Sequence, residues 1–161
     1  MTTVQPAPIP FQPRLHVLAA FLAVVGLADS IYLTITHLTG ENVTCIASSG
    51  CSEVLSSAYA SVGQIPLGAF GAIGYFLAFS LAVLAAFGYS RARTFLRILV
   101  VVMLATTLWL LYVQAFVLHA FCDFCLLSAA LTLSLTAIIV AGCFIERRHR
   151  TAVEQAPAPE S

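Results

Sequence analysis

The residues ILVVVMLATTLWLLYVQAFVLHAFCDFCLLSAALTLSLTAIIVAGCFI, at positions 98 to 145, decide the fold of this chain. They form two apolar runs that meet at Cys122 and contain one Asp but no Glu, Lys or Arg. An α-helix rises about 1.5 Å per residue and needs about 20 apolar residues to cross a hydrocarbon core of roughly 30 Å. The two runs therefore predict transmembrane helices over residues 98–121 and 122–145.

Two further apolar runs, over residues 15–38 and 65–89, have the same length and character. We therefore expect an all-α fold, an integral membrane bundle of four transmembrane helices. A short interfacial helix is expected at residues 51–57, in the first outer loop. Domain organisation is expected to be simple, with one membrane domain at 14–148 between disordered, Pro-containing tails at 1–13 and 149–161.

The charges indicate how the bundle is oriented. Of the 161 residues 60% are hydrophobic and 9% charged, and the formal net charge is zero, so no basic field favours nucleic acid. All seven basic residues are Arg, and they precede the first helix, separate the second from the third, or follow the fourth. Because positive charges stay inside, we expect both termini in the cytoplasm of a bacterial inner (cytoplasmic) membrane, with loops 39–64 and 119–123 outside.

Four of the five cysteines fall on the predicted outer face, as Cys45 with Cys51 in CIASSGC and Cys122 with Cys125 in CDFC. Thiols outside the cytoplasm are in an oxidising compartment and persist as disulfides. Cys143 lies at the inner end of the fourth helix and is expected to act as a packed or lipid-facing hydrophobe.

The CDFC spacing places two sulfurs one helical turn apart at the start of a helix, where unpaired backbone N–H groups stabilise a thiolate. The charge of Asp123 opposes that effect. A relay follows from exchange chemistry, since an outside thiol can reduce Cys45–Cys51, a released loop thiol can reduce Cys122–Cys125, and a quinone in the bilayer can accept the electrons.

Two other interpretations remain open for the four cysteines. They can form two structural disulfides in a non-catalytic membrane scaffold or partner subunit, or ligate a structural zinc ion. A bridge between consecutive turns adds little constraint to a helix, so the CDFC pair favours redox chemistry, and no metal site is expected.

These residues resemble the vitamin K epoxide reductase family, and particularly its bacterial homologues that support disulfide-bond formation. The resemblance runs from about Gly26 to about Ser128. It is carried by CIASSGC, by the overlapping segment CSEVLSSAYASVGQIPLGAFGAIGY, and by CDFC at the opening of the last helix.

The resemblance implies a four-helix bundle that encloses a quinone (ubiquinone or menaquinone) and passes electrons to it. It implies that Cys125 lies nearest the quinone, that Cys122 exchanges with Cys51, and that Cys45 meets a thioredoxin-like (DsbA-like) protein. Ser57 would anchor the loop helix and hydrogen-bond near the quinone. The chain has no fused thioredoxin-like domain, so that redox partner is expected to be a separate protein.

The sequence departs from the family at two positions. Members that reduce vitamin K epoxide carry an Asn early in the second helix and a Tyr after the CxxC motif, and Leu67 and Ala129 stand there in this chain. Quinone reduction is therefore expected rather than epoxide reduction.

Two ionisable residues are candidates for moving protons. Asp29 lies inside the predicted first helix, where a carboxyl group is a functional candidate by default. The alternative is a structural Asp29 that hydrogen-bonds Ser30, Tyr32 or Gln114. His119 precedes CDFC and suits proton transfer near neutral pH, or is a simple interfacial residue.

Aromatic residues and glycines have two interpretations as well. Phe121 is a candidate for supporting the quinone, together with other aromatic residues that would either line its pocket or pack between helices: Trp109, Tyr112, Phe116 and Phe124. Glycines at positions 68, 71 and 74 would let helices approach closely or make room for the ring.

Overall fold

The computed structural model describes residues 12–40, 45, 50–63 and 65–154 of the chain. Within these residues, four helices are long and apolar enough to cross a membrane. They are α1 (Gln12–Thr39), α3 (Leu67–Ala86), α4 (Ser90–Tyr112), which a π-helical turn η2 (Val113–Leu118) continues, and α5 (Asp123–Glu154). This architecture confirms the predicted four-helix membrane fold.

The short helix expected in the first loop is also present. It is α2 (Cys51–Ser56), and the 3₁₀ turn η1 (Ala58–Ala60) and a hairpin of two-residue strands follow it. Strands β1 (Ser61–Val62) and β2 (Ile65–Pro66) pair antiparallel, with Ser61 opposite Pro66. The hairpin leads directly into α3, for which Pro66 is the N-cap.

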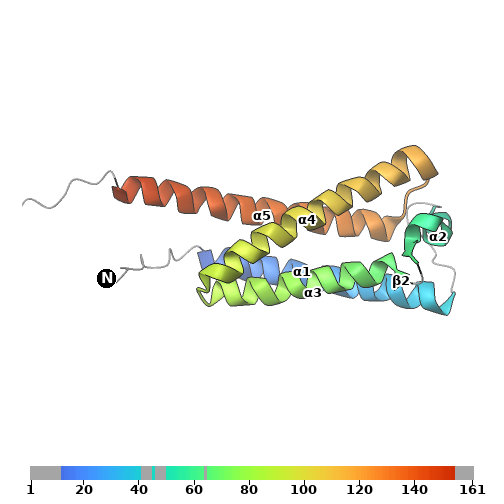
Figure 1. Ribbon diagram of the computed structural model, residues 1–161, viewed down its shortest axis with the longest axis horizontal. Helices are drawn as coiled ribbons and strands as arrows, with labels where there is room; N and C mark the ends of the chain where they lie inside the picture. Colours follow the sequence, from blue (N-terminus) through green and yellow to red (C-terminus); the bar gives the residue numbers. More distant parts are fainter. Residues whose placement is uncertain (1–11, 41–44, 46–49, 64, 155–161) are drawn as a thin grey trace, which may run out of the picture.

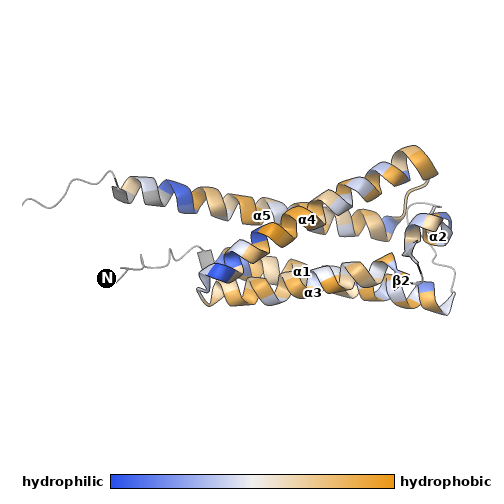
Figure 2. Cartoon of the chain, in the orientation of Figure 1, coloured by the Kyte–Doolittle hydropathy of each residue, from blue (hydrophilic) through white to orange (hydrophobic). Residues whose placement is uncertain are grey.

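The helices form two pairs, and the two ends of the bundle carry different elements (Figure 1). Helices α1 and α3 lie side by side, while α4 crosses α5, and α2 lies at the same end of the bundle as the α4–α5 corner. The start of α1 and the α3–α4 connection lie at the opposite end, and α5 extends past them in the same direction. Figure 2 shows hydrophilic residues at that end, in the first turns of α4 and the last turns of α5, and long hydrophobic stretches between.

Small residues allow α1 and α3 to approach closely. A Cβ atom on Gly68 would lie 2.8 Å from Thr34 Oγ1 and 3.1 Å from the Ser30 carbonyl oxygen, and one on Gly71 would lie 2.8 Å from Ser30 Oγ. Small side chains bring helix backbones together where lipid offers no hydrophobic driving force. The expectation of close approach at Gly68 and Gly71 is thus confirmed.

The helix ends differ from the predicted boundaries for identifiable reasons. Helix α3 ends at Ala86 rather than near Tyr89, because Gly88 adopts φ 93° and closes a Schellman motif. The Tyr89 N–H donates to the Leu84 carbonyl at 3.2 Å, and the Gly88 N–H donates to that of Ala85 at 3.0 Å.

Helix α5 continues to Glu154, so residues 149–154 are helical although the sequence favours a disordered tail from 149. Proline ends helices, and the first one after Arg148 is Pro157. The remainder of that predicted tail, residues 155–161, and residues 1–11 of the N-terminal one lie outside the described residues.

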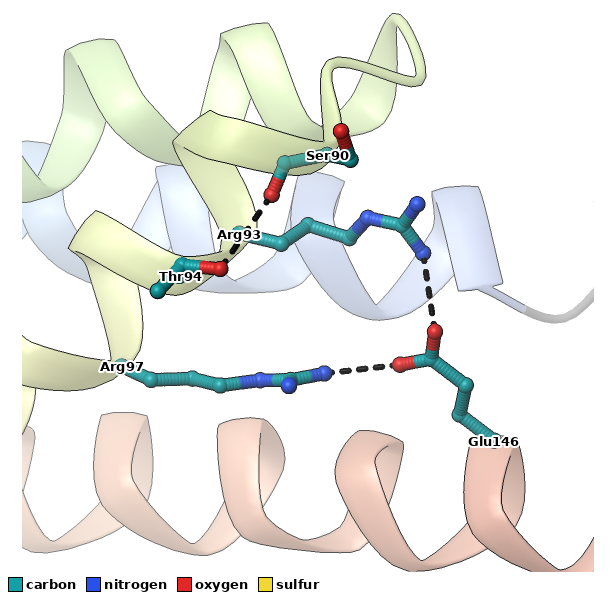
Figure 3. A network of polar contacts seen from close by, with 5 residues as sticks. All are labelled: Ser90, Arg93, Thr94, Arg97 and Glu146. Atoms are coloured by element: carbon teal, nitrogen blue, oxygen red, sulfur yellow. Dashed lines mark hydrogen bonds and ion pairs between the residues drawn. The ribbon is translucent and has the colours of Figure 1, made fainter.

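An ion-pair network joins α4 to α5 at the Arg-containing end (Figure 3). The Glu146 carboxylate accepts from Arg97 Nη2 at 2.7 Å and from Arg93 Nη1 at 3.4 Å. Ser90 and Thr94 form a separate hydrogen bond within the first turns of α4. The crossed pair α4–α5 is therefore fixed at this end by charge.

Candidate active site

The first loop presents Cys45 and Cys51 as a disulfide with a Cα–Cα distance of 5.7 Å. Cys51 opens α2 and is 1% exposed, while Cys45 is partly buried. The Val54 N–H donates to the Gly50 carbonyl at 2.9 Å and starts the helix at this cysteine. The loop pair thus has one buried sulfur and one that is nearer the surface.

The second pair stands at the corner between α4 and α5. Cys122 directly precedes α5, since its carbonyl accepts the Leu126 N–H at 2.9 Å, and Cys125 lies in the first helical turn. Both are free thiols, Cys122 fully buried and Cys125 partly buried. This is the position that the CDFC spacing predicts, with Cys122 just before the helix rather than its first residue.

The surroundings of Cys122 favour its thiolate. A hydrogen bond from the Cys125 thiol, together with the backbone N–H groups of Cys125 and Phe124, lowers the pKa of Cys122 to about 7. Burial and the charge of Asp123 act in the opposite direction. A thiol of low pKa is both a ready nucleophile at neutral pH and a good leaving group in exchange.

The two pairs meet in one apolar cluster. Its buried members are Cys51, Val54, Ala120 and Cys122, and Cys45 and Cys125 pack against it. The tertiary structure therefore brings together all four cysteines that the sequence singles out, although 70 residues lie between Cys51 and Cys122 along the chain.

Gly50 allows this meeting. A Cβ atom at that position would lie 2.8 Å from the Phe121 carbonyl oxygen and 2.9 Å from its nitrogen, so the loop packs directly on the backbone beside CDFC. Only glycine fits such a close approach of two chain segments.

A cavity of about 300 Å³ lies beneath the cysteine cluster, between the helices. Its wall is mainly apolar and includes Cys125 and Ser57, whereas the other three candidate cysteines are not part of it. Its volume is near the lower end of the range of about 300–1,000 Å³ that is typical of small-molecule sites. Such a wall suits a flat, apolar ligand, and the thiol of Cys125 borders the space.

Several predicted residues stand at the cavity wall. Gly68, Gly71 and Gly74 line it, so the glycines that bring α1 and α3 together also make room inside the bundle. Leu67 and Ala129 line it too. The two positions at which the sequence departs from the epoxide-reducing members thus face the cavity with apolar side chains.

One polar cluster of the cavity wall is centred on Tyr75, which the sequence does not single out. The hydroxyl of Tyr75 is 2.9 Å from both the Ser128 carbonyl and Ser128 Oγ, and 3.0 Å from Thr132 Oγ1. This cluster joins α3 to α5 and lines the cavity. Ser57 also donates its hydroxyl to the Val54 carbonyl at 2.7 Å, so it closes α2 at the cavity wall.

Gln114, which the sequence indicates only as a possible partner of Asp29, is another polar residue of the cavity wall. It is 3% exposed, lies in η2, and lines the cavity. Its Oε1 accepts the Cys122 N–H at 3.2 Å, and its side chain also hydrogen-bonds the Cys125 thiol.

Asp29 is 8% exposed, and neither carboxylate oxygen has a hydrogen-bond partner among the described residues. The expected bonds to Ser30, Tyr32 or Gln114 are therefore absent, and the interpretation of a hydrogen-bonded structural Asp29 is wrong. Asp29 does not line the cavity. Its charge acts on Tyr75 and Cys125, and both of these residues line the cavity.

The remaining candidates lie apart from the cavity. His119 is exposed and adopts φ 50°, the left-handed conformation that ends η2 and turns the chain toward Cys122. The chain therefore leaves the helix at Leu118, not at Phe121. Phe121 is 45% exposed and does not line the cavity.

The other aromatic residues that the sequence singles out form no part of the cavity wall either. Trp109, Tyr112 and Phe116 are exposed side chains that pack in sequence along one side of α4 and η2, with ring centroids 6.2 and 5.0 Å apart. Phe124 packs on Tyr32 at 5.1 Å. None of these four residues lines the cavity, so their positions favour packing, the other interpretation of this group.

Metal binding was an alternative for the cysteines. In the part of the chain that the structure describes, no group of three or more His, Cys, Asp or Glu side chains is placed to hold a metal ion. The loop sulfurs are instead bonded to each other.

The model of the vitamin K epoxide reductase family matches residues 17–140 of the chain, which include all four cysteines of the cluster and every residue that lines the cavity.

Proposed function

The chain belongs to the vitamin K epoxide reductase family, whose members are quinone-linked thiol oxidoreductases, and on this premise we propose that it reoxidises a thioredoxin-like disulfide donor. The observation that carries the proposal is the continuous arrangement of the cysteines. Cys45 is partly buried, Cys51 and Cys122 are buried in the same cluster, and Cys125 reaches the cavity. The electron path would follow that order.

The first step takes place at the loop. A thiolate of the donor protein attacks Cys45, the Cys45–Cys51 bond breaks, and the second donor thiol resolves the mixed disulfide. The donor leaves oxidised, and Cys45 and Cys51 remain as thiols. The donor is defined here by its chemistry alone, as a separate protein that carries a pair of thiols.

The second step is exchange inside the cluster. The Cys51 thiolate attacks Cys122, and the Cys125 thiolate leaves. Cys45 then attacks Cys51 and expels Cys122, which is favoured because a thiol of low pKa is the better leaving group. The products are a Cys45–Cys51 disulfide and the thiols Cys122 and Cys125, which is the redox state that the structure has.

The third step returns the CxxC motif to a disulfide. A quinone bound in the cavity accepts two electrons and two protons. Cys125 faces that space, and Cys122 then closes the bond with it. Leu67 and Ala129 offer no hydrogen bond at the cavity wall, which supports a quinone rather than an epoxide as the substrate.

Single-cysteine variants test the electron path. Cys45→Ser is expected to accumulate a Cys51–Cys122 disulfide, because the resolving thiol is missing. In Cys51→Ser the Cys45 thiolate is expected to attack the disulfide of an oxidised donor, which releases one donor thiol and leaves a donor–Cys45 mixed disulfide. Cys143→Ser, which lies near the other end of α5, is the matched control. Full thiol oxidation by Cys125→Ser would refute the proposal.

The scaffold alternative predicts a different result in one assay. Mass-tagged maleimide counts the free thiols of the purified protein before and after a quinone is added. The relay predicts that two thiols become protected, whereas a protein with purely structural disulfides keeps a constant count.

Membrane orientation forms part of the same proposal. The end with the arginines would face the cytoplasm and the cysteine cluster the periplasmic or extracellular side. Membrane-impermeant maleimide applied to bacterial spheroplasts is expected to label Ser52→Cys and not Ser90→Cys, two exposed positions at opposite ends. The reverse pattern would overturn the orientation.

A further inference from the structure

Gln114 occupies an unusual place in the backbone. It lies in η2, the π-helical turn that ends the α4 segment, and such turns are frequent at functional sites. The Gln114 carbonyl accepts the N–H of His119 and, at 3.2 Å, that of Ala120. Its main chain therefore fixes the turn that leads into Cys122.

The side chain of Gln114 fixes the cysteines themselves. Its Oε1 accepts the Cys122 N–H at 3.2 Å, and only the oxygen of an amide can accept a hydrogen bond. This contact determines the orientation of the amide, and the NH₂ group is left for the Cys125 thiol. An NH₂ group carries two donors, and Gln114 also lines the cavity.

We propose that Gln114 is the positioning residue of the quinone-reducing thiol, holding Cys122 through Oε1 while its NH₂ group stabilises the Cys125 thiolate and offers a donor to the quinone oxygen. The role rests on the proposed quinone reduction. The NH₂ group of Gln114 gives the cavity a hydrogen-bond donor, whereas the side chains of Leu67 and Ala129 provide none.

The physical reason for such a group is the low polarity of its surroundings. Gln114 is almost completely buried, and a thiolate in an apolar site requires hydrogen bonds to its charged form. A fixed donor needs no reorganisation when charge develops beside it. The hydrogen bond from the Cys122 N–H holds the Gln114 amide in place, because it prevents this amide from rotating.

Two variants separate this role from a merely structural one. Gln114→Glu keeps an oxygen for the Cys122 N–H but replaces the NH₂ donors with an acidic group, and Gln114→Met removes both contacts at similar size. Ser134→Ala, an exposed position on α5, is the control. The measurements are the pH profile of Cys125 alkylation, and kcat and KM with a short-chain, water-soluble benzoquinone.

The proposal predicts that Gln114→Met moves the Cys125 alkylation profile to higher pH and lowers kcat by at least about tenfold, because a charge-assisted hydrogen bond is lost. KM for the benzoquinone is expected to rise. Gln114→Glu is expected to move the alkylation profile in the same direction and further, since a carboxylate repels the thiolate.

An unchanged Cys125 profile with unchanged benzoquinone kinetics in both variants would overturn the proposal and leave Gln114 as a turn-forming residue. The alkylation profile needs no quinone and no partner protein. If the unaltered protein reduced no quinone, the proposed function would fail, whereas the profile would still decide the role of Gln114 toward Cys125.

Discussion

Gly50 and Phe121 are in backbone contact, so closely that a Cβ atom on Gly50 would lie 2.8 Å from the Phe121 carbonyl oxygen. This contact seats α2 against the turn that precedes α5. It brings the loop cysteines to the CxxC motif.

Gly50→Ala should therefore slow exchange between the two cysteine pairs. The added methyl group must displace the loop, and small displacements of reacting groups cost about 10- to 100-fold in rate. The measurement is the rate at which a Cys51–Cys122 disulfide forms in the Cys45→Ser background. Gly142→Ala is the control, because a Cβ atom there meets only Leu15 Cδ1, at 3.6 Å. Equal rates in the two glycine variants would contradict the prediction.

Asp123→Asn should make Cys122 more acidic. The Asp123 charge raises the pKa of Cys122, so its removal lowers that pKa further below its present value of about 7. The thiolate is then populated at lower pH, and pulsed iodoacetamide should label Cys122 faster than in the unaltered protein between about pH 5 and 7. Mass spectrometry of the labelled peptide measures this, with Glu146→Gln as the control. If the labelling of Cys122 in Asp123→Asn required a higher pH than in the unaltered protein, the predicted direction of the pKa change would be wrong.

Asp29→Asn should keep or increase stability but slow quinone reduction. A buried carboxylate without a hydrogen-bond partner among the described residues stabilises nothing, so its replacement by an amide should change the free energy of unfolding by no more than about 1 kcal/mol. If Asp29 supplies protons, the quinone reduction rate falls and Asp29→Glu restores part of it. Thermal unfolding and stopped-flow quinone reduction are the measurements. A rate equal to that of the unaltered protein would exclude proton supply by Asp29.

Gly68→Ala and Gly74→Ala should separate packing from cavity space. A Cβ atom on Gly68 meets Thr34 and the α1 backbone within 3.1 Å, so the substitution should destabilise the protein by about 1–3 kcal/mol. At Gly74 it meets only the flexible Met103 side chain, at 3.7 Å or more. Gly74→Ala should keep the Tm and raise the quinone KM, because it narrows the cavity. Comparable losses of Tm in both variants would contradict this assignment.

Glu146→Gln should weaken the α4–α5 pair without affecting the redox reaction. The carboxylate is half of both ion pairs with Arg93 and Arg97, and partly exposed pairs contribute up to about 1 kcal/mol. We expect a slightly lower Tm, with a difference that shrinks at high salt. Thiol oxidation should be unchanged, since the network lies at the end of the bundle opposite to α2. A slower oxidation rate would indicate coupling along α5.

The sequence by itself determines the four membrane helices, the loop helix and the two cysteine pairs. Helix length against bilayer thickness is a local property, and so is the spacing of CDFC, which places Cys122 and Cys125 one turn apart. Proline and glycine signals set the helix ends only approximately. The left-handed His119 and the π-helical turn before it end the third helix earlier than the hydrophobic pattern indicates, because hydropathy does not report backbone hydrogen bonding.

Only the tertiary structure decides which residues share a site. It places Gly50 on Phe121, gives Gln114 two cysteine partners, leaves Asp29 without a hydrogen bond among the described residues, and turns the aromatic side chains of α4 away from the cavity. In a chain that is apolar on every face, the hydrophobic pattern does not tell which face of a helix packs inward. That choice depends on close contacts between small residues far apart in the chain, and it determines which polar groups reach Cys125.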